Sequence, residues 1–282
     1  MHRAPAAGPV TPDRSGTGQT ARVHGPLVGR TALVTGASRR GAIGAAVARR
    51  LARDGADLLL HSWSPHDEEQ PWGADSGGVD ALLDELRAEG VRVDHVSADL
   101  ADPATATRLV EAAGAVSGHL DVLVAVHARS SSQDLEHLTV EELDRSWAVN
   151  ARATLLLVQA FAAAHDDARP GGRVLLFTSG QDHGAMPGEL PYIASKAVLH
   201  QLTRSLAVHL VPRRITVNTI DPGPTDTGWA DPATLEAVAA VHPSGRWSTP
   251  ADTARAVGWL VSDEADWITG QVLRSDGGWA SR

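Results

Sequence analysis

The sequence predicts an α/β fold in which helices cover both faces of a mostly parallel β-sheet. Short apolar segments alternate with helical patterns along the 282-residue chain, which indicates buried parallel strands joined by helical crossovers. Because such crossovers are right-handed, the helices form a layer on each side of a doubly wound sheet. No Pro/Ser-rich break interrupts the alternation, so we expect residues 27–282 to form a single three-layer α/β/α domain.

The individual elements follow from the apolar runs and from the helical periodicity between them. The strand candidates are residues 31–35, 57–61, 92–97, 122–126, 173–178, 216–220 and 271–275. The helical patterns cover residues 42–54, 77–89, 103–117, 139–165, 191–211 and 250–261. Ligands of such folds bind at the carboxyl ends of the strands, where Gly36, Asp99, Ala125, Ser179 and Pro222 are expected to converge.

The first 26 residues differ from the rest in composition. They are rich in Pro, Gly and small polar residues and lack the apolar core of a secretory signal. We expect a disordered tail. A short regulatory or oligomer-contacting arm is the alternative.

Composition and charge exclude several classes of function. A formal net charge of −9 argues against nucleic acid or an anionic membrane as the main partner. The absence of Cys excludes disulfides, thiolate metal sites and Cys nucleophiles, and it is compatible with a cytoplasmic enzyme. No apolar run approaches the ~20 residues that span a bilayer. The 13 His are scattered without a ligand cluster, so we expect no metal site.

One short motif carries most of the chemical information. Tyr192 and Lys196 are four residues apart, so on a helix they share one face, and Ser179 lies upstream. A cationic Lys near a phenol favours the phenolate and lowers the pKa of the Tyr. A nearby Ser hydroxyl can then hold a substrate oxygen while Tyr192 transfers a proton. The alternative is an ordinary amphipathic helix.

A glycine-rich turn near the start of the chain indicates a dinucleotide site. The apolar run 31–35 ends at Gly36, and an Ala-rich helical pattern begins close to Gly44. A strand, glycine turn and helix in this order present backbone N–H groups to a diphosphate. A plain tight turn is the alternative.

Together these motifs resemble the short-chain dehydrogenase/reductase family, of the compact single-domain type, over about residues 27–279. The resemblance implies a Rossmann fold and a catalytic tetrad of Asn150, Ser179, Tyr192 and Lys196. It also implies that residues 217–225 pack around the nicotinamide. Relatives with a similar loop at residues 63–73 are often labelled putative 3-oxoacyl-[acyl-carrier-protein] reductases.

The chain departs from the family pattern in three places. The glycine turn is about two residues longer than the common form, and its middle Gly is replaced by Ala42. A methyl group there requires a negative φ. The family's Asn-Asn-Ala-Gly segment, whose Asn ties neighbouring strands together, is replaced by residues 125–128. His127 can supply a replacement hydrogen bond, or it can be a partly exposed His at a strand end.

The cofactor is expected to be NADP(H) rather than NAD(H). No carboxylate stands at the tip of the second strand to bind a ribose 2′-OH, since Asp67 comes too late in the chain. Arg39 and Arg40 can instead pair with a 2′-phosphate. The alternative is two solvated arginines, with Ser62 serving the ribose. The expected cofactor-binding residues are Gly36, Ser38, Arg39, Arg40, Ile43, Gly44, Ser62, Asp99, Leu100, Ala125, Tyr192, Lys196, Pro222, Gly223 and Thr225.

These expectations define a hypothesis for the reaction. Hydride passes between nicotinamide and a carbonyl compound or secondary alcohol, with ketone reduction favoured and Tyr192 as general acid or base. Asn150 holds a water that relays protons through Lys196. The alternative is a catalytically silent dinucleotide-binding sensor or scaffold on the same fold.

The substrate and the assembly are less well defined by the sequence. Ser179, Gln181, His183, Tyr192 and Trp229 are expected to bind a small-molecule carbonyl or alcohol substrate. A hydrogen bond that stabilises the loop is the alternative for His183. Trp63 and Trp72 either pack over the adenosine or lie on a neighbouring subunit. The family resemblance implies a homo-oligomer, a tetramer or a dimer.

Overall fold

The computed structural model describes residues 24–169 and 171–281. Residues 1–23 of the predicted disordered tail (1–26) therefore lie outside the described residues. Residues 24–26 already lead into a turn, in which Val28 N–H donates to the Gly25 carbonyl. The strands are β1 (Thr31–Thr35), β2 (Asp57–Ser62), β3 (Val93–Ser97), β4 (Val122–Ala125), β5 (Arg173–Phe177), β6 (Thr216–Asp221) and β7 (Val272–Arg274).

All seven strands pair in parallel in one sheet of order β3-β2-β1-β4-β5-β6-β7. The predicted doubly wound fold is confirmed, and every predicted strand is present within one or two residues of its expected bounds. The chain reverses its direction of winding between β1 and β4. These two strands are paired, and Thr35 of β1 lies opposite Ala125 of β4. A crevice for a ligand forms outside the strand ends at such a switch point.

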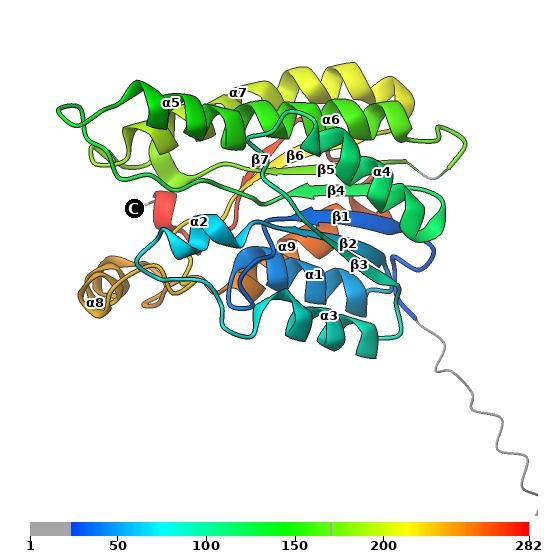
Figure 1. Cartoon of the computed structure of the whole chain (residues 1–282), viewed down its shortest axis with the longest axis horizontal. Helices are drawn as coiled ribbons and strands as arrows, with labels where there is room; N and C mark the ends of the chain where they lie inside the picture. The colour runs from blue at the N-terminus through cyan, green and yellow to red at the C-terminus, as the bar shows by residue number, and fades with distance from the viewer. Residues whose placement is uncertain (1–23, 170, 282) are drawn as a thin grey trace, which may run out of the picture.

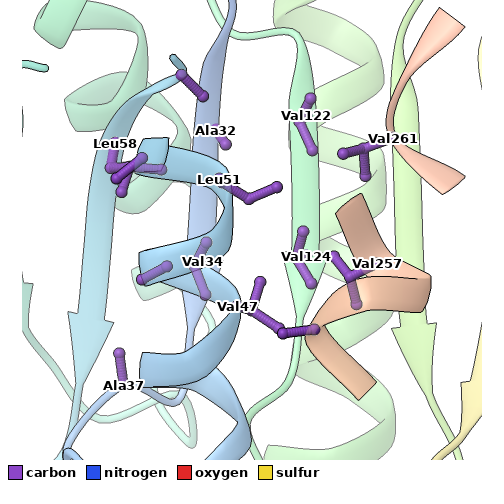
Figure 2. Close-up of a cluster of buried hydrophobic side chains, with 14 of the residues drawn as sticks. Ala32, Val34, Ala37, Val47, Leu51, Leu58, Val122, Val124, Val257 and Val261 are labelled. Carbon is purple, nitrogen blue, oxygen red and sulfur yellow. The ribbon is translucent and has the colours of Figure 1, made fainter. Parts of the chain in front are cut away.

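Helices cover both faces of this sheet (Figure 1). One layer holds α1 (Ile43–Arg53), α3 (Gly78–Ala88) and α9 (Pro250–Leu260), and the other holds α4 (Thr105–Ser117), α6 (Ala153–Ala164) and α7 (Leu190–Leu210). Figure 2 shows side chains of α1 and α9, among them Leu51 and Val257, directed toward Val122 and Val124 of β4. Each fully buried Val or Leu of this kind contributes about 1.5–3 kcal/mol.

The structure corrects three segments of the sequence-based assignment. The helical pattern at 139–165 is α5 (Val140–Ser146), a π-helical turn (Trp147–Arg152) and α6. The loops at 63–73 and 225–247 contain α2 (Ser64–Glu68) and α8 (Pro232–Val241). Both helices carry Pro in their first turn, which is a start signal. They are short, and α8 has no buried residue, so neither shows a clear apolar periodicity.

The continuous helical stretch Val140–Ala164 is long and apolar enough to cross a membrane by length and composition. In this structure it is a core helix. Its buried residues include Leu157, Val158 and Phe161, which belong to the apolar cluster between the sheet and α4. Core helices commonly have this composition.

Candidate active site

A cavity of about 780 Å³ lies at the carboxyl ends of the strands, and it is lined in part by α2, α8 and the C-terminal turn. In Figure 1 these three segments lie at the edge toward which the strand arrows point. Gly36, Asp99, Ser179 and Pro222 line the cavity as expected for residues that follow strands. Ala125 is buried and does not line the cavity, whereas its neighbour Val126 does.

Tyr192 lies in the first turn of α7 and faces this cavity together with Ser179, which follows β5. The Ser179 hydroxyl lies close enough to the phenol to lower its pKa, which favours the phenolate. Burial nevertheless raises the pKa of Tyr192 above its ordinary value, and the charges of Glu189 and Asp221 act in the same direction. The pKa of Tyr192 is therefore raised rather than lowered as expected, because desolvation is the largest effect and Lys196 is not among the groups that shift it.

Lys196 is one helical turn beyond Tyr192 and is buried. Its Nζ donates to the main-chain carbonyls of Phe177, over 3.0 Å, and His127, over 3.3 Å. Burial lowers the pKa of Lys196 to about 8. The amino group is thus anchored to the ends of two neighbouring strands and titrates close to neutral pH.

Asn150 lies in the π-helical turn and is fully buried. Its Nδ2 donates to Ser195 Oγ over 2.9 Å and to the Arg129 carbonyl over 3.0 Å, while its Oδ1 accepts from Arg129 N–H over 2.6 Å. Ser195 Oγ in turn donates to the Tyr192 carbonyl over 2.8 Å. Asn150 therefore holds the first turn of α7 in place, and π-turns of this kind are frequent at functional sites.

The glycine turn has the shape that a diphosphate requires. Gly36 has a φ of +74°, and a Cβ there would lie 2.7 Å from His127 Cα. A Cβ on Gly44 would lie 2.3 Å from the Gly36 carbonyl oxygen, so helix and turn pack closely. Ala42 has a φ of −89°, as its methyl group requires, and no side chain caps α1. The start of α1 therefore has no side-chain cap, and Ala42, Ile43 and Gly44 line the cavity there, which fits a dinucleotide phosphate.

His127 replaces the strand-tying Asn with a hydrogen-bonded imidazole. Nε2 lies 3.0 Å from the Val149 carbonyl, which can only accept, so Nε2 carries the proton. Nδ1 then accepts from Thr35 Oγ1 over 2.7 Å. Burial, aided by the Lys196 charge, holds the pKa of His127 well below its ordinary value. His127 is thus buried and bonded, which excludes the alternative of a partly exposed His.

His61, at the end of β2, was not among the expected site residues but also supports the turn. Its Nε2 donates to the Ala98 carbonyl over 2.9 Å, and its Nδ1 accepts from Gly36 N–H over 3.3 Å. Burial lowers the pKa of His61 to about 4. A neutral imidazole therefore fixes the backbone of Gly36. A His inside a strand pattern gives no sequence signal of such a role.

The two arginines of the turn have different surroundings. Arg39 lines the cavity, where its guanidinium pairs with Asp67 at 3.2 Å and donates to the Thr227 carbonyl over 2.8 Å. It also lies 5.2 Å from the ring centre of Trp72. Arg40 is bound by Asp75 through both side-chain and backbone donors and does not line the cavity. Asp67 lies five residues after the end of β2, but helix α2 brings it back to the cavity beside Arg39. The expectation that Asp67 comes too late in the chain to reach this site is therefore wrong.

Most of the expected cofactor and substrate residues meet in this one cavity. Those that line it are Gly36, Ser38, Arg39, Ile43, Gly44, Asp99, Leu100, Ser179, Tyr192, Lys196, Pro222, Gly223, Thr225 and Trp229. Those that do not are Arg40, Ser62, Ala125, Asn150, Gln181 and His183. Residues that sequence reasoning did not select for the site also line it, among them Asp67, Glu189, Trp247 and Trp279.

Three of the residues outside the cavity have partners that explain their position. Ser62 Oγ bonds to His95 Nε2 over 2.8 Å, so it is turned away from a ribose at the cavity. Gln181 Nε2 donates to Thr178 Oγ1 over 3.1 Å. His183 Nε2 lies 3.0 Å from Asp221 Oδ2, which favours the alternative of a hydrogen bond that stabilises the loop.

Comparison with known proteins agrees with this geometry. The family model described as Enoyl-(Acyl carrier protein) reductase matches residues 36–280. The uncharacterized oxidoreductase YjdA of Bacillus subtilis (strain 168) is 38% identical over 250 residues, which cover 88% of this chain and 96% of YjdA.

Two solved structures superpose on the chain, each with a TM-score of 0.80. The short-chain dehydrogenase/reductase from Serratia marcescens BCRC 10948 is 31% identical, with 90% of this chain and 99% of that chain covered. The landomycin C-6 ketoreductase LanV, with bound NADP and rabelomycin, is 32% identical, with 93% and 100% covered. The chain therefore belongs to the short-chain dehydrogenase/reductase family and is an NAD(P)-dependent oxidoreductase that acts on carbonyl compounds.

Proposed function

We propose that the protein is an NADP(H)-dependent ketone reductase in which Tyr192 is the general acid. The observation that carries this proposal is the placement of Tyr192, Ser179 and Lys196 on the wall of the same strand-end cavity, with Lys196 one helical turn beyond Tyr192. Bound in this cavity, a reduced nicotinamide supplies hydride to the substrate carbon.

The protonation state of Tyr192 favours reduction over oxidation. Because its pKa is raised, the phenol carries its proton at neutral pH. A protonated phenol can donate to a carbonyl oxygen as that oxygen becomes an alkoxide, whereas alcohol oxidation needs the phenolate. Ser179, which lines the same cavity and interacts with the phenol, orients the substrate oxygen beside it.

Lys196 and Asn150 return a proton to Tyr192 after each turnover in this proposal. With a pKa of about 8, Lys196 can give up and regain a proton near neutral pH. Both side-chain N–H donors of Asn150 are used by Ser195 and Arg129, and in this proposal its main-chain carbonyl holds the relaying water. That carbonyl already accepts from Thr154 Oγ1 over 2.8 Å and has a second lone pair.

Arg39 supports the preference for NADP(H). Its guanidinium lies in the cavity and can turn from Asp67 toward a 2′-phosphate, which is a stronger acceptor than a ribose hydroxyl. The similar ketoreductase LanV has bound NADP. No observation on this chain favours the silent sensor over the enzyme.

Titration with NADPH and NADH tests the cofactor preference, with reduced-nicotinamide fluorescence as the readout. We expect at least tenfold tighter binding of NADPH. Arg39→Ala should remove most of this difference, and Asp67→Asn should increase it because the competing carboxylate is gone. Arg40→Ala is the matched control and should change neither affinity more than threefold. Tighter binding of NADH by the unaltered protein would contradict the proposal.

We also propose that the chain forms a homo-oligomer. Large apolar side chains are exposed on the surfaces of α7 and the helical stretch 140–164, including Val208 at 75% and Trp147 at 46% of full exposure. Exposed apolar patches of this kind mark contact surfaces. Light scattering coupled to size-exclusion chromatography should give the mass of a dimer or tetramer, and a monomer at micromolar concentration would refute this part.

A further inference from the structure

Three tryptophans from the C-terminal third of the chain line the cavity that also contains Tyr192, in addition to Trp63 and Trp72 from the segment around α2. Trp229 follows β6, Trp247 lies between α8 and α9, and Trp279 begins the C-terminal turn. Each lines the same cavity as Tyr192 and Ser179. A substrate whose carbonyl meets Tyr192 can therefore contact these rings within the same cavity.

The polar atoms of two of these side chains are used elsewhere. Trp229 Nε1 donates to the Thr225 carbonyl over 3.2 Å, and Trp247 Nε1 donates to the Leu235 carbonyl over 2.8 Å. The two rings meet edge to face at a centroid distance of 5.7 Å. What they can offer a ligand is therefore apolar ring surface, and 47% of Trp229 is still exposed.

Trp279 is held in a defined orientation. Its ring stacks on the imidazole of His242, with centroids 5.5 Å apart and planes inclined by 26°. A rigid aromatic wall of this kind favours a flat, rigid ligand over a flexible chain, because a flexible chain loses more conformational freedom on binding.

One carboxyl group interrupts this apolar surface. Glu189 lines the cavity three residues before Tyr192, and among the described residues no donor is hydrogen-bonded to its side chain. Burial raises its pKa. A partly buried carboxyl without a protein partner is costly, and a hydroxyl group on the ligand would satisfy it.

We propose that the substrate is a planar, fused-ring aromatic ketone that carries a second hydroxyl group, with the rings held by the three tryptophans and the hydroxyl bound by Glu189. This inference rests on the proposed ketone reduction and adds the substrate class to it. Each aromatic contact is worth up to roughly tenfold in affinity.

The aromatic part is tested with two ketones on one carbon skeleton. 2-Tetralone is half aromatic and flat at that ring, whereas trans-2-decalone is saturated, and neither carbonyl is conjugated. We expect NADPH-dependent kcat/KM to be at least 20-fold higher for 2-tetralone. Trp229→Leu should reduce this ratio to about threefold or less, and Trp229→Phe should largely preserve it. Trp259→Leu, an exposed Trp outside the cavity, is the matched control and should not change it.

The polar part is tested with 6-hydroxy-2-tetralone against 2-tetralone. We expect the hydroxylated ketone to have at least fivefold higher kcat/KM, and Glu189→Leu should bring this ratio close to one. Comparing the two ketones within each variant cancels any effect of Glu189 on the pKa of Tyr192. An unchanged ratio in Glu189→Leu would refute the role of this residue.

Turnover and binding separate the failure of this inference from failure of the proposed function. Equal kcat/KM for 2-tetralone and trans-2-decalone overturns the inference and leaves the ketone reductase intact. If neither ketone is reduced, calorimetry of the protein with NADP⁺ compares 2-naphthol with decahydro-2-naphthol. At least tenfold tighter binding of 2-naphthol would then support the aromatic site. In that case only the proposed ketone reductase function would be contradicted. Equal or absent binding overturns the aromatic site.

Discussion

Asn150 Nδ2 donates a hydrogen bond to Ser195 Oγ over 2.9 Å, in the buried interface between the π-helical turn and α7. Ser195 Oγ in turn donates a hydrogen bond to the main-chain carbonyl of Tyr192, so Asn150 restrains the backbone of Tyr192 through Ser195. The general acid is therefore positioned by a residue 42 places earlier in the chain, through a side chain between them in space. A helix that followed the α pattern throughout residues 140–164 would turn Asn150 elsewhere.

Ser195→Ala should weaken this link. The substitution leaves a buried amide donor of Asn150 with one partner fewer, which costs about 1–3 kcal/mol of unfolding free energy. Because Tyr192 is then less firmly positioned, kcat should fall severalfold while the dissociation constant for NADPH changes little. Urea denaturation and steady-state kinetics measure both effects. A loss below about 0.5 kcal/mol with unchanged kcat would show that the Asn150–Ser195 bond does not position the acid.

Gly44→Ala and Gly41→Ala form a matched pair within the glycine turn. A methyl on Gly44 would lie 2.3 Å from the Gly36 carbonyl oxygen, whereas a methyl on Gly41 meets nothing within 4 Å. Gly44→Ala should therefore cost about 1–3 kcal/mol of stability through overpacking and weaken dinucleotide binding at least tenfold. Gly41→Ala should change the free energy of unfolding by no more than about 0.5 kcal/mol. Its dinucleotide affinity should stay within twofold of that of the unaltered protein. Equal effects of the two substitutions would contradict the close packing of turn and helix.

Stability should decline in mild acid because of His61. Its folded-state pKa of about 4 lies below the ordinary value of 6.5, so the unfolded chain binds more protons between these two pH values. The stabilisation is fully present above pH 6.5 and is lost as the pH falls toward 4, with a full size of about 3 kcal/mol. The carboxylates of the protein add their own acid sensitivity.

A His61→Gln variant isolates this contribution, since an amide can still accept from Gly36 and donate to Ala98. Urea denaturation of both proteins at pH 7 and pH 4.5 gives the difference directly. Between pH 7 and pH 4.5, we expect the free energy of unfolding to fall by about 2 kcal/mol less in the variant than in the unaltered protein. The same pH dependence in both would show that His61 is not the titrating group.

The sequence predicted the architecture well because the signals that define it are local. Apolar runs and helical periodicity located the seven strands to within one or two residues, and the strand-end rule brought Gly36, Ser179 and Pro222 to one cavity. The negative φ of Ala42 also followed from local sterics. Each of these inferences depends on a few neighbouring residues.

What the sequence could not predict depends on contacts between distant segments. Arg40 is bound by Asp75, and Asp67 reaches Arg39 only because α2 folds back over the cavity. The raised pKa of Tyr192 reflects its burial with Glu189 and Asp221, which no i, i+4 spacing reveals. The π-helical turn at Asn150 keeps an apolar pattern close to that of an α-helix, so periodicity does not distinguish it.

The most direct test of the account is NADPH-dependent reduction of a ketone by Tyr192→Phe, the substitution of the only Tyr in the chain. The variant lacks only the phenolic hydroxyl, so we predict that kcat/KM falls at least a thousandfold while NADPH binds within threefold of its original affinity. Retention of more than a few per cent of activity would contradict the assignment of Tyr192 as the proton donor.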